Sequence, residues 1–273
     1  MKKSNNEIRD AVRKSYRKVA ENALSDNYCG CSPGEDTGCC SPEETNLYEA
    51  SSRIGYSDKE LKEVPEGSNL GLGCGNPQAI AALKEGETVL DLGSGAGFDV
   101  FLAARQVGDK GKVIGVDMTQ EMISKARKNA AMGNFNNVEF RLGEIENIPV
   151  ADNTADVIIS NCVINLSPEK QKVFNESLRV LKPGGRLAIT DNITTAELPE
   201  EIKNNLEHYS ACISGAALVG ELENMLKNAG FINIKIEPID KSRKLTSKWI
   251  PGGNINDYIV PVTVEAAKPE GIR

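Results

Sequence analysis

The feature that most constrains the fold of this chain is a glycine-rich turn that follows a short apolar run. Residues 89–97 read Val-Leu-Asp-Leu-Gly-Ser-Gly-Ala-Gly, and a helical pattern begins directly after them. Glycine adopts positive φ and lets a ligand approach the backbone closely. Such a turn between a strand and a helix is typical of nucleotide-binding α/β proteins. The turn therefore predicts an α/β fold with a ligand site at the carboxyl end of this strand.

From about residue 87 the chain alternates β-rich runs with helical stretches. Strands are expected at 88–92, 112–117, 138–142, 156–160, 185–191, 231–239 and 258–266. Helices are expected at 98–107, 120–132, 168–181 and 219–228. Leu-Lys-Pro-Gly-Gly at 181–185 indicates a helix end and a turn, and Gly230 suits a helix C-terminus. This rhythm predicts a Rossmann-like, seven-stranded, mostly parallel sheet with helices on both faces.

The sequence divides into three expected regions. Residues 1–78 form a cysteine-containing N-terminal extension, 79–240 form the ligand-binding domain, and 241–273 form a small substrate-binding region. An amphipathic helix is expected within 1–24, and irregular loops within 25–78. Apolar side chains at helical spacing define one face of that first helix, at Ile8, Val12, Tyr16, Val19 and Leu24.

Acidic residues flank the glycine turn. Asp91 lies two residues before Gly93, and Asp117 ends the next strand, 20 residues after Gly97. A carboxylate at that distance can accept both hydroxyls of a ribose. The glycines at 93, 95 and 97 follow G-x-G-x-G spacing, and no Lys-Ser/Thr follows them, which excludes a phosphate-cradling P-loop.

This set resembles the class I S-adenosylmethionine-dependent methyltransferases over about residues 75–240. The resemblance implies S-adenosylmethionine as methyl donor, with no catalytic metal. The residues that it assigns to the cofactor are Asp91, Gly93, Ser94, Gly95, Gly97, Asp117, Met118, Glu144, Ile145 and Asn161. The alternative is a turn in another nucleotide-binding α/β fold.

Composition excludes several classes of function. The net charge is −7 and aromatic residues make up 5% of the chain, which argues against a nucleic-acid partner. A single His disfavours a His-ligated metal or a His-activated nucleophile. No apolar run suits a signal peptide or a membrane span, so a cytoplasmic location without a membrane partner is expected.

The seven cysteines form two groups. Cys74, Cys162 and Cys212 are expected near the mouth of the cleft, where the strands of a parallel sheet end. Cys29, Cys31, Cys39 and Cys40 lie within twelve residues of a polar loop. Their C-x-C and C-C spacings fit a structural zinc site poorly and favour disulfide or soft-metal chemistry, although zinc stays open.

A methyl acceptor that already holds a lone pair needs no base, and His208, the only His of this chain, has neighbours that suggest a helix surface. Trivalent arsenic is such an acceptor, because it is soft, binds three thiolates and keeps a lone pair. The segments Ser-Asn-Cys-Val-Ile-Asn-Leu at 160–166, Cys-Gly at 74–75, Cys-x-x-Gly-Ala at 212–216 and Leu-Pro-Glu-Glu-Ile at 198–202 resemble the arsenite methyltransferases.

The resemblance to arsenite methyltransferases implies roles for four cysteines. Cys162 and Cys212 would hold As(III) as substrate, with Cys74 as third ligand or disulfide partner. A fourth cysteine comes from the N-terminal loop, and the Cys39–Cys40 pair is favoured. Arsenite would arrive as a thiol complex, and thioredoxin or a small thiol would act as reductant. The alternatives are a methyltransferase for a small organic acceptor, such as a quinone or sterol, and a non-enzymatic arsenic or metal sensor.

Overall fold

The computed structural model describes residues 3–22, 47–241, 243–245 and 254–271. The four N-terminal cysteines and Leu24 lie outside these ranges. Helices occupy α1 (Asn5–Asn22), α2 (Leu47–Arg53), α3 (Asp58–Glu63), α4 (Gln78–Ala81), α5 (Phe98–Val107), α6 (Gln120–Met132), α7 (Lys170–Val180), α8 (Glu200–Lys203), α9 (Leu206–Ser210) and α10 (Val219–Ala229). No helix of the described ranges combines the length and the apolar character that crossing a membrane demands.

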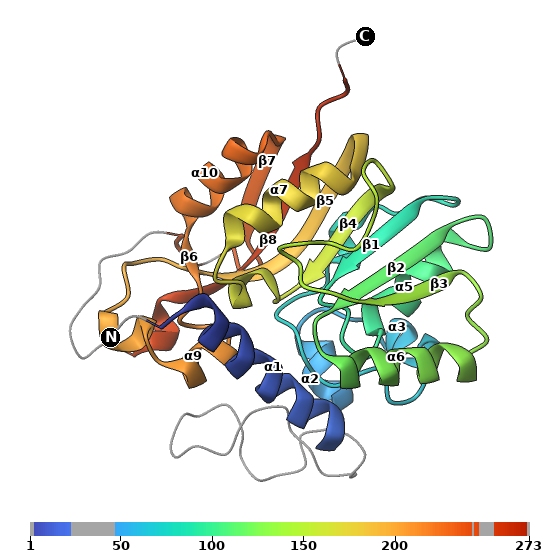
Figure 1. The fold of residues 1–273 in the computed structure, drawn as a ribbon, viewed down its shortest axis with the longest axis horizontal. Coiled ribbons are helices and arrows are strands. Elements are labelled where there is room, and N and C mark those ends of the chain that lie inside the picture. Colours follow the sequence, from blue (N-terminus) through green and yellow to red (C-terminus); the bar gives the residue numbers. More distant parts are fainter. Residues whose placement is uncertain (1–2, 23–46, 242, 246–253, 272–273) are drawn as a thin grey trace.

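One sheet runs through the molecule (Figure 1). Its strands are β1 (Thr88–Leu92), β2 (Lys112–Asp117), β3 (Val138–Leu142), β4 (Ala155–Asn161), β5 (Leu181–Thr194), β6 (Ala217–Leu218), β7 (Ile232–Pro238) and β8 (Ile259–Ala267). The order is β3-β2-β1-β4-β5-β8-β7, and the short β6 pairs with β5 outside this path. Strands β1 to β5 are parallel, whereas β8 runs antiparallel to β5 and β7. The expected α/β architecture is confirmed, with β6 as an eighth strand.

Both faces of the sheet are buried, as the continuous apolar runs predict. Leu90 and Leu92 of β1 belong to a core cluster completed by α7 and α10. Val89, on the opposite face, packs in a second cluster with residues of α5 and α6. Successive side chains of a strand thus point to opposite faces of the sheet. This alternation fixes the pairing of the strands, because a slip of one residue would move every side chain to the wrong face.

Several element boundaries differ from the sequence-based expectation. Strand β5 begins at Leu181, because Leu181 pairs with Ala155 of β4, and residues 182–185 form an irregularity before pairing resumes at Arg186 and Val157. Residues 47–78 are not wholly irregular, since α2, α3 and the start of α4 lie there; Ser57 and Glu60 form a capping box at α3. Strand β8, which belongs to the expected C-terminal region 241–273, lies inside the sheet between β5 and β7.

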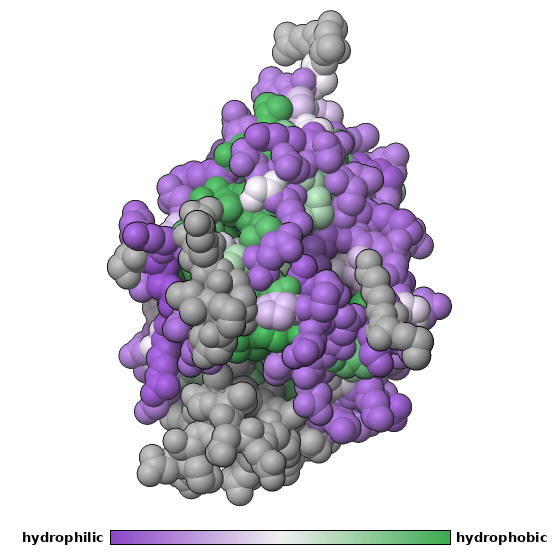
Figure 2. Space-filling view, turned by 90° about the vertical axis from the view of Figure 1, so that its left-hand side faces the viewer, coloured by the Kyte–Doolittle hydropathy of each residue, from purple (hydrophilic) through white to green (hydrophobic). Residues whose placement is uncertain are grey.

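The N-terminal helix α1 forms, and it packs beside α6 and α9 (Figure 1). Its Val12 and Val19 are buried, and Ile8 and Tyr16 pack against buried clusters, so the expected apolar face is confirmed for the described residues. Figure 2 shows the side of the molecule turned to the left in Figure 1: polar side chains cover most of it, and apolar ones gather in its middle. Helix α1 thus covers apolar surface that the sheet and its helices leave open.

Candidate active site

The glycine turn after β1 has the left-handed backbone that its sequence predicts. Gly93, Gly95 and Gly97 all have positive φ, and Gly97 is the N-cap of α5. A Cβ on Gly93 would lie 2.3 Å from the Val163 side chain, whereas a Cβ on Gly95 would meet no atom within 4 Å. The turn is therefore packed at Gly93 and open at Gly95. The open position is where a ligand can approach the backbone.

Three carboxyl groups surround this turn, of which those of Asp91 and Asp99 are buried and that of Asp117 is half-buried. Asp91 and Asp99 are only 2% and 7% exposed, and burial raises the pKa of Asp91 well above its usual value. Burial also raises the pKa of Asp117, whose oxygens accept hydrogen bonds from the backbone N–H groups of Gly95 and Thr119. Clustered carboxyl groups, whose pKa values are raised by burial and, at Asp91, also by repulsion from the other two, favour a cationic ligand. S-adenosylmethionine, with its sulfonium and ammonium groups, fits this set of acceptors.

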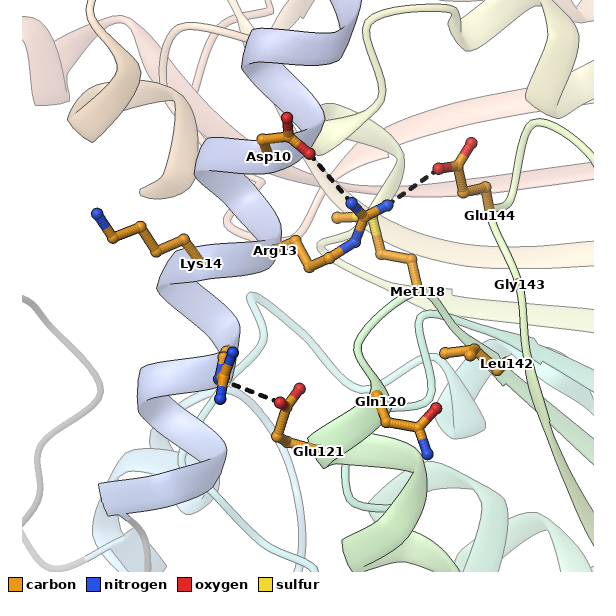
Figure 3. Close-up of a pocket in the computed structure, with 10 residues that line it drawn as sticks. Asp10, Arg13, Lys14, Met118, Gln120, Glu121, Leu142, Gly143 and Glu144 are labelled. Atoms are coloured by element: carbon orange, nitrogen blue, oxygen red, sulfur yellow. Dashed lines mark hydrogen bonds and ion pairs between the residues drawn. The ribbon is translucent and has the colours of Figure 1, made fainter.

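A pocket of about 570 Å³ lies between α1 and the carboxyl ends of β2 and β3 (Figure 3). Met118, Leu142 and Glu144 line one wall, and Asp10, Arg13, Lys14 and Arg17 of α1 line the other. Arg13 bridges Glu144 and Asp10, with both N–O distances at 3.1 Å (Figure 3). The expected adenine-side residues Met118 and Glu144 thus face a cavity of a size typical for small ligands, and α1 forms its outer wall.

The structure brings Cys74, Cys162 and Cys212 together. The sulfurs of Cys74 and Cys162 and a carboxylate oxygen of Asp191 lie within 4.8 Å of one another. The thiol of Cys212 donates to the Cys162 carbonyl oxygen at 3.3 Å, and the Cys162 thiol also contacts the other two thiols. All three are free thiols, with Cys162 and Cys212 buried and Cys74 half-buried. Thiols from three separate segments, far apart in sequence, therefore converge.

Cys162 and Cys212 occupy strained backbone positions. Their φ values are +59° and +58°, in the left-handed region that residues with a Cβ rarely adopt. Cys162 directly follows β4, where its N–H donates to the Thr190 carbonyl at 2.8 Å. Strain of this kind costs about 1–3 kcal/mol and concentrates at functional sites. The fold maintains it at two of the three thiols.

The environment keeps these thiols protonated. Burial raises the pKa of Cys74 to about 11. The contact with Cys212 lowers the pKa of Cys162, but the Cys74 thiol and burial outweigh it and raise that pKa well above 9. The Cys162 thiol and burial likewise raise the pKa of Cys212. Asp191, whose pKa burial raises to about 6, adds negative charge beside them. Three neutral thiols suit a neutral, thiophilic ligand.

Helix α1 covers the cysteine cluster. Val12 is 1% exposed and packs with Cys162, Cys212 and Tyr209. The Tyr16 hydroxyl forms a hydrogen bond with the Cys212 thiol that lowers the thiol's pKa, against the larger effects that raise it. One helix therefore contributes to the wall of the pocket and to the roof of the thiol site.

Arg9 anchors this helix, and its loss should loosen the roof. Its guanidinium, 13% exposed, pairs with Glu144, Glu146 and Glu169. Arg9→Ala leaves Glu146, whose side chain is 8% exposed, without a charged partner among the described residues, whereas Glu144 keeps Arg13 and Glu169 keeps Lys172. The free energy of unfolding should therefore fall by about 2–3 kcal/mol. Arg17→Ala is the matched control, because Arg17 is 58% exposed and should cost about 0.5 kcal/mol or less. Urea denaturation of both variants checks this; equal losses would contradict the anchoring role.

Asp99 should give the protein a distinctive pH dependence. Burial raises its pKa to about 6, against about 3.9 in an unfolded chain. The folded state therefore holds a proton more tightly, so this contribution to stability is present below pH 4 and is lost as pH rises to 6. The loss amounts to about 2–3 kcal/mol. Asp99→Asn should abolish this pH-dependent loss of stability. Thermal denaturation of the variant and the wild type from pH 4 to 7, without cofactor, measures the difference between their stabilities at each pH. Parallel curves would contradict it.

The other expected cofactor residues are placed as follows. Ile145 is buried in the core below the pocket, and the Ser94 hydroxyl lies against β2, where a Cβ on Gly115 would be 2.7 Å from it. Asn161 ends β4, and its amide bonds to the segment that carries Cys74. Ser94 can therefore reach a ligand only through its backbone.

Sequence reasoning missed two residues at the thiol site. Asp191 lies near the carboxyl end of β5, and a carboxylate at a strand end was the signal available for it. Tyr16 was identified only as part of an apolar helix face. Its hydroxyl contact with Cys212 depends on how α1 docks, which no local pattern specifies.

Comparisons with known proteins agree with this geometry. A family described as methyltransferase domain matches residues 83–230. An arsenite methyltransferase of Halobacterium salinarum is 50% identical over 266 residues, or 96% of this chain and 67% of that protein. An arsenite methyltransferase of Aquipseudomonas alcaligenes is 36% identical over 84% of this chain and 63% of that protein.

The fold of this chain is also similar to a solved structure. An arsenic (III) S-adenosylmethionine methyltransferase from Chlamydomonas reinhardtii matches with a TM-score of 0.60 and 29% identity, over 81% of this chain and 73% of that one. The chain spans about two thirds of the length of the two curated relatives. It belongs to the arsenite methyltransferases, a family of S-adenosylmethionine-dependent methyltransferases.

Proposed function

We propose that this chain transfers the methyl group of S-adenosylmethionine to trivalent arsenic held by Cys74, Cys162 and Cys212. The observation that carries the proposal is the convergence of three free thiols beside the glycine turn and its acidic cluster. The single His of the chain, His208 in α9, makes none of the described contacts with the three thiols. A lone-pair acceptor needs no general base.

In this mechanism the thiols bind arsenic and hold it in place. Arsenite arrives as a complex with three small thiols and exchanges them for the three cysteine thiols, with release of three free thiols and no net proton, which suits cysteines whose pKa values are raised. Bound S-adenosylmethionine supplies a methyl group on a sulfonium. The arsenic lone pair forms the As–C bond while the S–CH₃ electron pair returns to sulfur. Alignment of the bound reactants supplies much of the acceleration.

The transfer leaves arsenic formally oxidised by two electrons. Formation of one cysteine disulfide supplies those two electrons and restores As(III). The N-terminal thiols, favoured at Cys39 and Cys40, would pass this disulfide on to thioredoxin or a small thiol as reductant. A small thiol would also carry arsenite to the site. Free thiols at the site suit a reducing, cytoplasmic location, which is part of the proposal.

A double variant tests this relay. Cys39→Ser/Cys40→Ser should keep a single turnover but lose multiple turnover, because only the exit route for the disulfide is removed. The measurement is methylated arsenic formed per protein chain with thioredoxin as sole reductant. Turnover at the wild-type rate would remove the relay and leave the methyl transfer itself untouched.

Thiol protection tests the proposed function against a methyltransferase for an organic acceptor. Arsenite should protect Cys74, Cys162 and Cys212 together from alkylation by N-ethylmaleimide, and alkylation should abolish methyl transfer. Mass spectrometry of the labelled peptides reports each cysteine. Alkylated protein that still transfers methyl groups to any acceptor at the wild-type rate would contradict the assignment. Calorimetry that detects no S-adenosylmethionine binding would favour a non-enzymatic sensor instead.

A further inference from the structure

The side chain of Asn161 fixes the backbone on which Cys74 lies. Its Oδ1 accepts hydrogen bonds from the Cys74 N–H at 3.0 Å and from the Thr190 hydroxyl at 3.1 Å. Its Nδ2 donates to the Gly75 carbonyl at 2.8 Å. A Cβ on Gly73 would lie 2.7 Å from the same amide, so this segment approaches Asn161 as closely as glycine permits. The amide therefore holds both sides of Cys74.

Tyr56 is one of the partners that determine which way this amide points, together with the Gly75 carbonyl and, at 3.4 Å, the Asp99 carboxylate. The Tyr56 hydroxyl donates to the Asp99 carboxylate, at 2.8 Å and 3.0 Å from its two oxygens. Because the hydroxyl hydrogen is used there, its oxygen is left to accept, and it accepts from Asn161 Nδ2 at 2.9 Å. This orients Nδ2 toward Tyr56 and Oδ1 toward the Cys74 N–H. Without Tyr56, the amide would lose one of the partners that distinguish its two ends.

Cys74 depends on such support more than the other two thiols. Cys162 directly follows β4 and Cys212 follows the C-cap residue of α9, so regular elements set their positions. Cys74 lies between α3 and α4, in a stretch without helix or strand. Among the described residues, no backbone–backbone hydrogen bond involves Gly73, Cys74 or Gly75, and the Cys74 N–H bonds to the Asn161 side chain instead. An error of 1 Å in placing a reacting group can cost about 100-fold in rate.

We propose that Tyr56, anchored by Asp99 and acting through Asn161, positions Cys74 beside Cys162 for the arsenic substrate. Tyr56 is 2% exposed and touches neither thiol in the described contacts, so it is a positioning residue. The chain Asp99–Tyr56–Asn161–Cys74 also joins the first turn of α5, directly after the glycine turn, to an arsenic ligand. This inference rests on the proposed function for the identity of the substrate, but its geometric part does not.

Tyr56→Phe tests the proposal by removing one hydroxyl. The affinity for arsenite and kcat/KM for arsenite should each fall about tenfold, the equivalent of one hydrogen bond, while the Kd for S-adenosylmethionine stays within twofold. Tyr48→Phe is the matched control, because its hydroxyl bonds to Asp58 on the surface and its loss should leave all three values unchanged. Calorimetry gives the affinities.

A double-mutant cycle separates positioning from general destabilisation. In a Cys74→Ser background, where two thiols still bind arsenite, Tyr56→Phe should cause no further loss of arsenite affinity. Equal losses in both backgrounds, or a loss confined to S-adenosylmethionine affinity, would overturn the proposal. Thr190→Val, which removes the other donor to Asn161 Oδ1, provides a second variant should Tyr56→Phe fail to fold, with the same expected pattern.

Alkylation tests the geometric part without arsenic. Tyr56→Phe should raise the rate at which iodoacetamide labels Cys74 about tenfold and leave the rates at Cys162 and Cys212 unchanged. Unchanged labelling of Cys74 would overturn the positioning role. If wild-type protein neither binds nor methylates arsenite, the proposed function fails, and this labelling pattern still decides whether Tyr56 holds Cys74.

Discussion

Cys162→Ser is expected to lower arsenite methylation by at least about 100-fold while the Kd for S-adenosylmethionine changes by less than twofold. Cys162 contacts both other thiols and lies with Cys74 and Asp191 in the tightest part of the cluster. Serine has nearly the same size and can occupy the same left-handed backbone, so the substitution removes only the sulfur. A hydroxyl oxygen is a poor ligand for soft As(III).

The two readouts of Cys162→Ser separate chemistry from folding. Calorimetry with S-adenosylmethionine serves as the internal control, because a misfolded variant would lose cofactor binding as well. A variant that binds the cofactor normally and methylates arsenite at nearly the wild-type rate would remove Cys162 from the arsenic site. The thiol assignment would then have to be abandoned.

Gly95→Ala is expected to raise the Kd for S-adenosylmethionine about 10- to 100-fold with only a modest loss of stability. The new Cβ meets no protein atom within 4 Å, so it projects into the open space beside the turn. Left-handed backbone, with φ +51°, should cost alanine about 1–2 kcal/mol. Crowding of a bound ligand costs a further 1–3 kcal/mol, which appears only in binding.

Gly86→Ala is the matched control for Gly95→Ala. Gly86 also has positive φ, and its Cβ would also meet nothing, but it lies at the amino end of β1, away from the turn. Both variants should therefore lose similar stability in thermal denaturation, and only Gly95→Ala should lose cofactor affinity. Equal cofactor affinities would show that the open position at Gly95 is not where the cofactor binds.

The sequence predicted the sheet and its order of elements well because the signals are local. Strands β1, β2 and β3 and helices α5 and α6 have the expected bounds, since each combines a clear apolar period with a glycine or polar boundary. The strand at residues 181–185 was missed because Pro and Gly ordinarily end regular structure. Here Leu181 pairs with Ala155 and Arg186 with Val157, and the residues between them form an irregularity within the strand.

The candidate site was predictable where topology alone assigns positions. Parallel strands end at one edge, so the placement of Cys162 followed from β4 once its strand was identified. Cys74 and Cys212 required the resemblance to a family, because neither follows a strand directly. The Tyr16 contact and the Tyr56–Asn161 network depend on long-range docking of α1 and of the segment before α4. No period or spacing encodes those contacts.

The most direct test of the central claim is speciation of arsenic after incubation with this protein. The reaction contains the full chain, S-adenosylmethionine, arsenite and thioredoxin with its reductase, and chromatography coupled to elemental detection identifies the products. The account predicts methylated arsenic, with one S-adenosylhomocysteine formed for each methyl group transferred. Unchanged arsenite from protein that binds S-adenosylmethionine would contradict it.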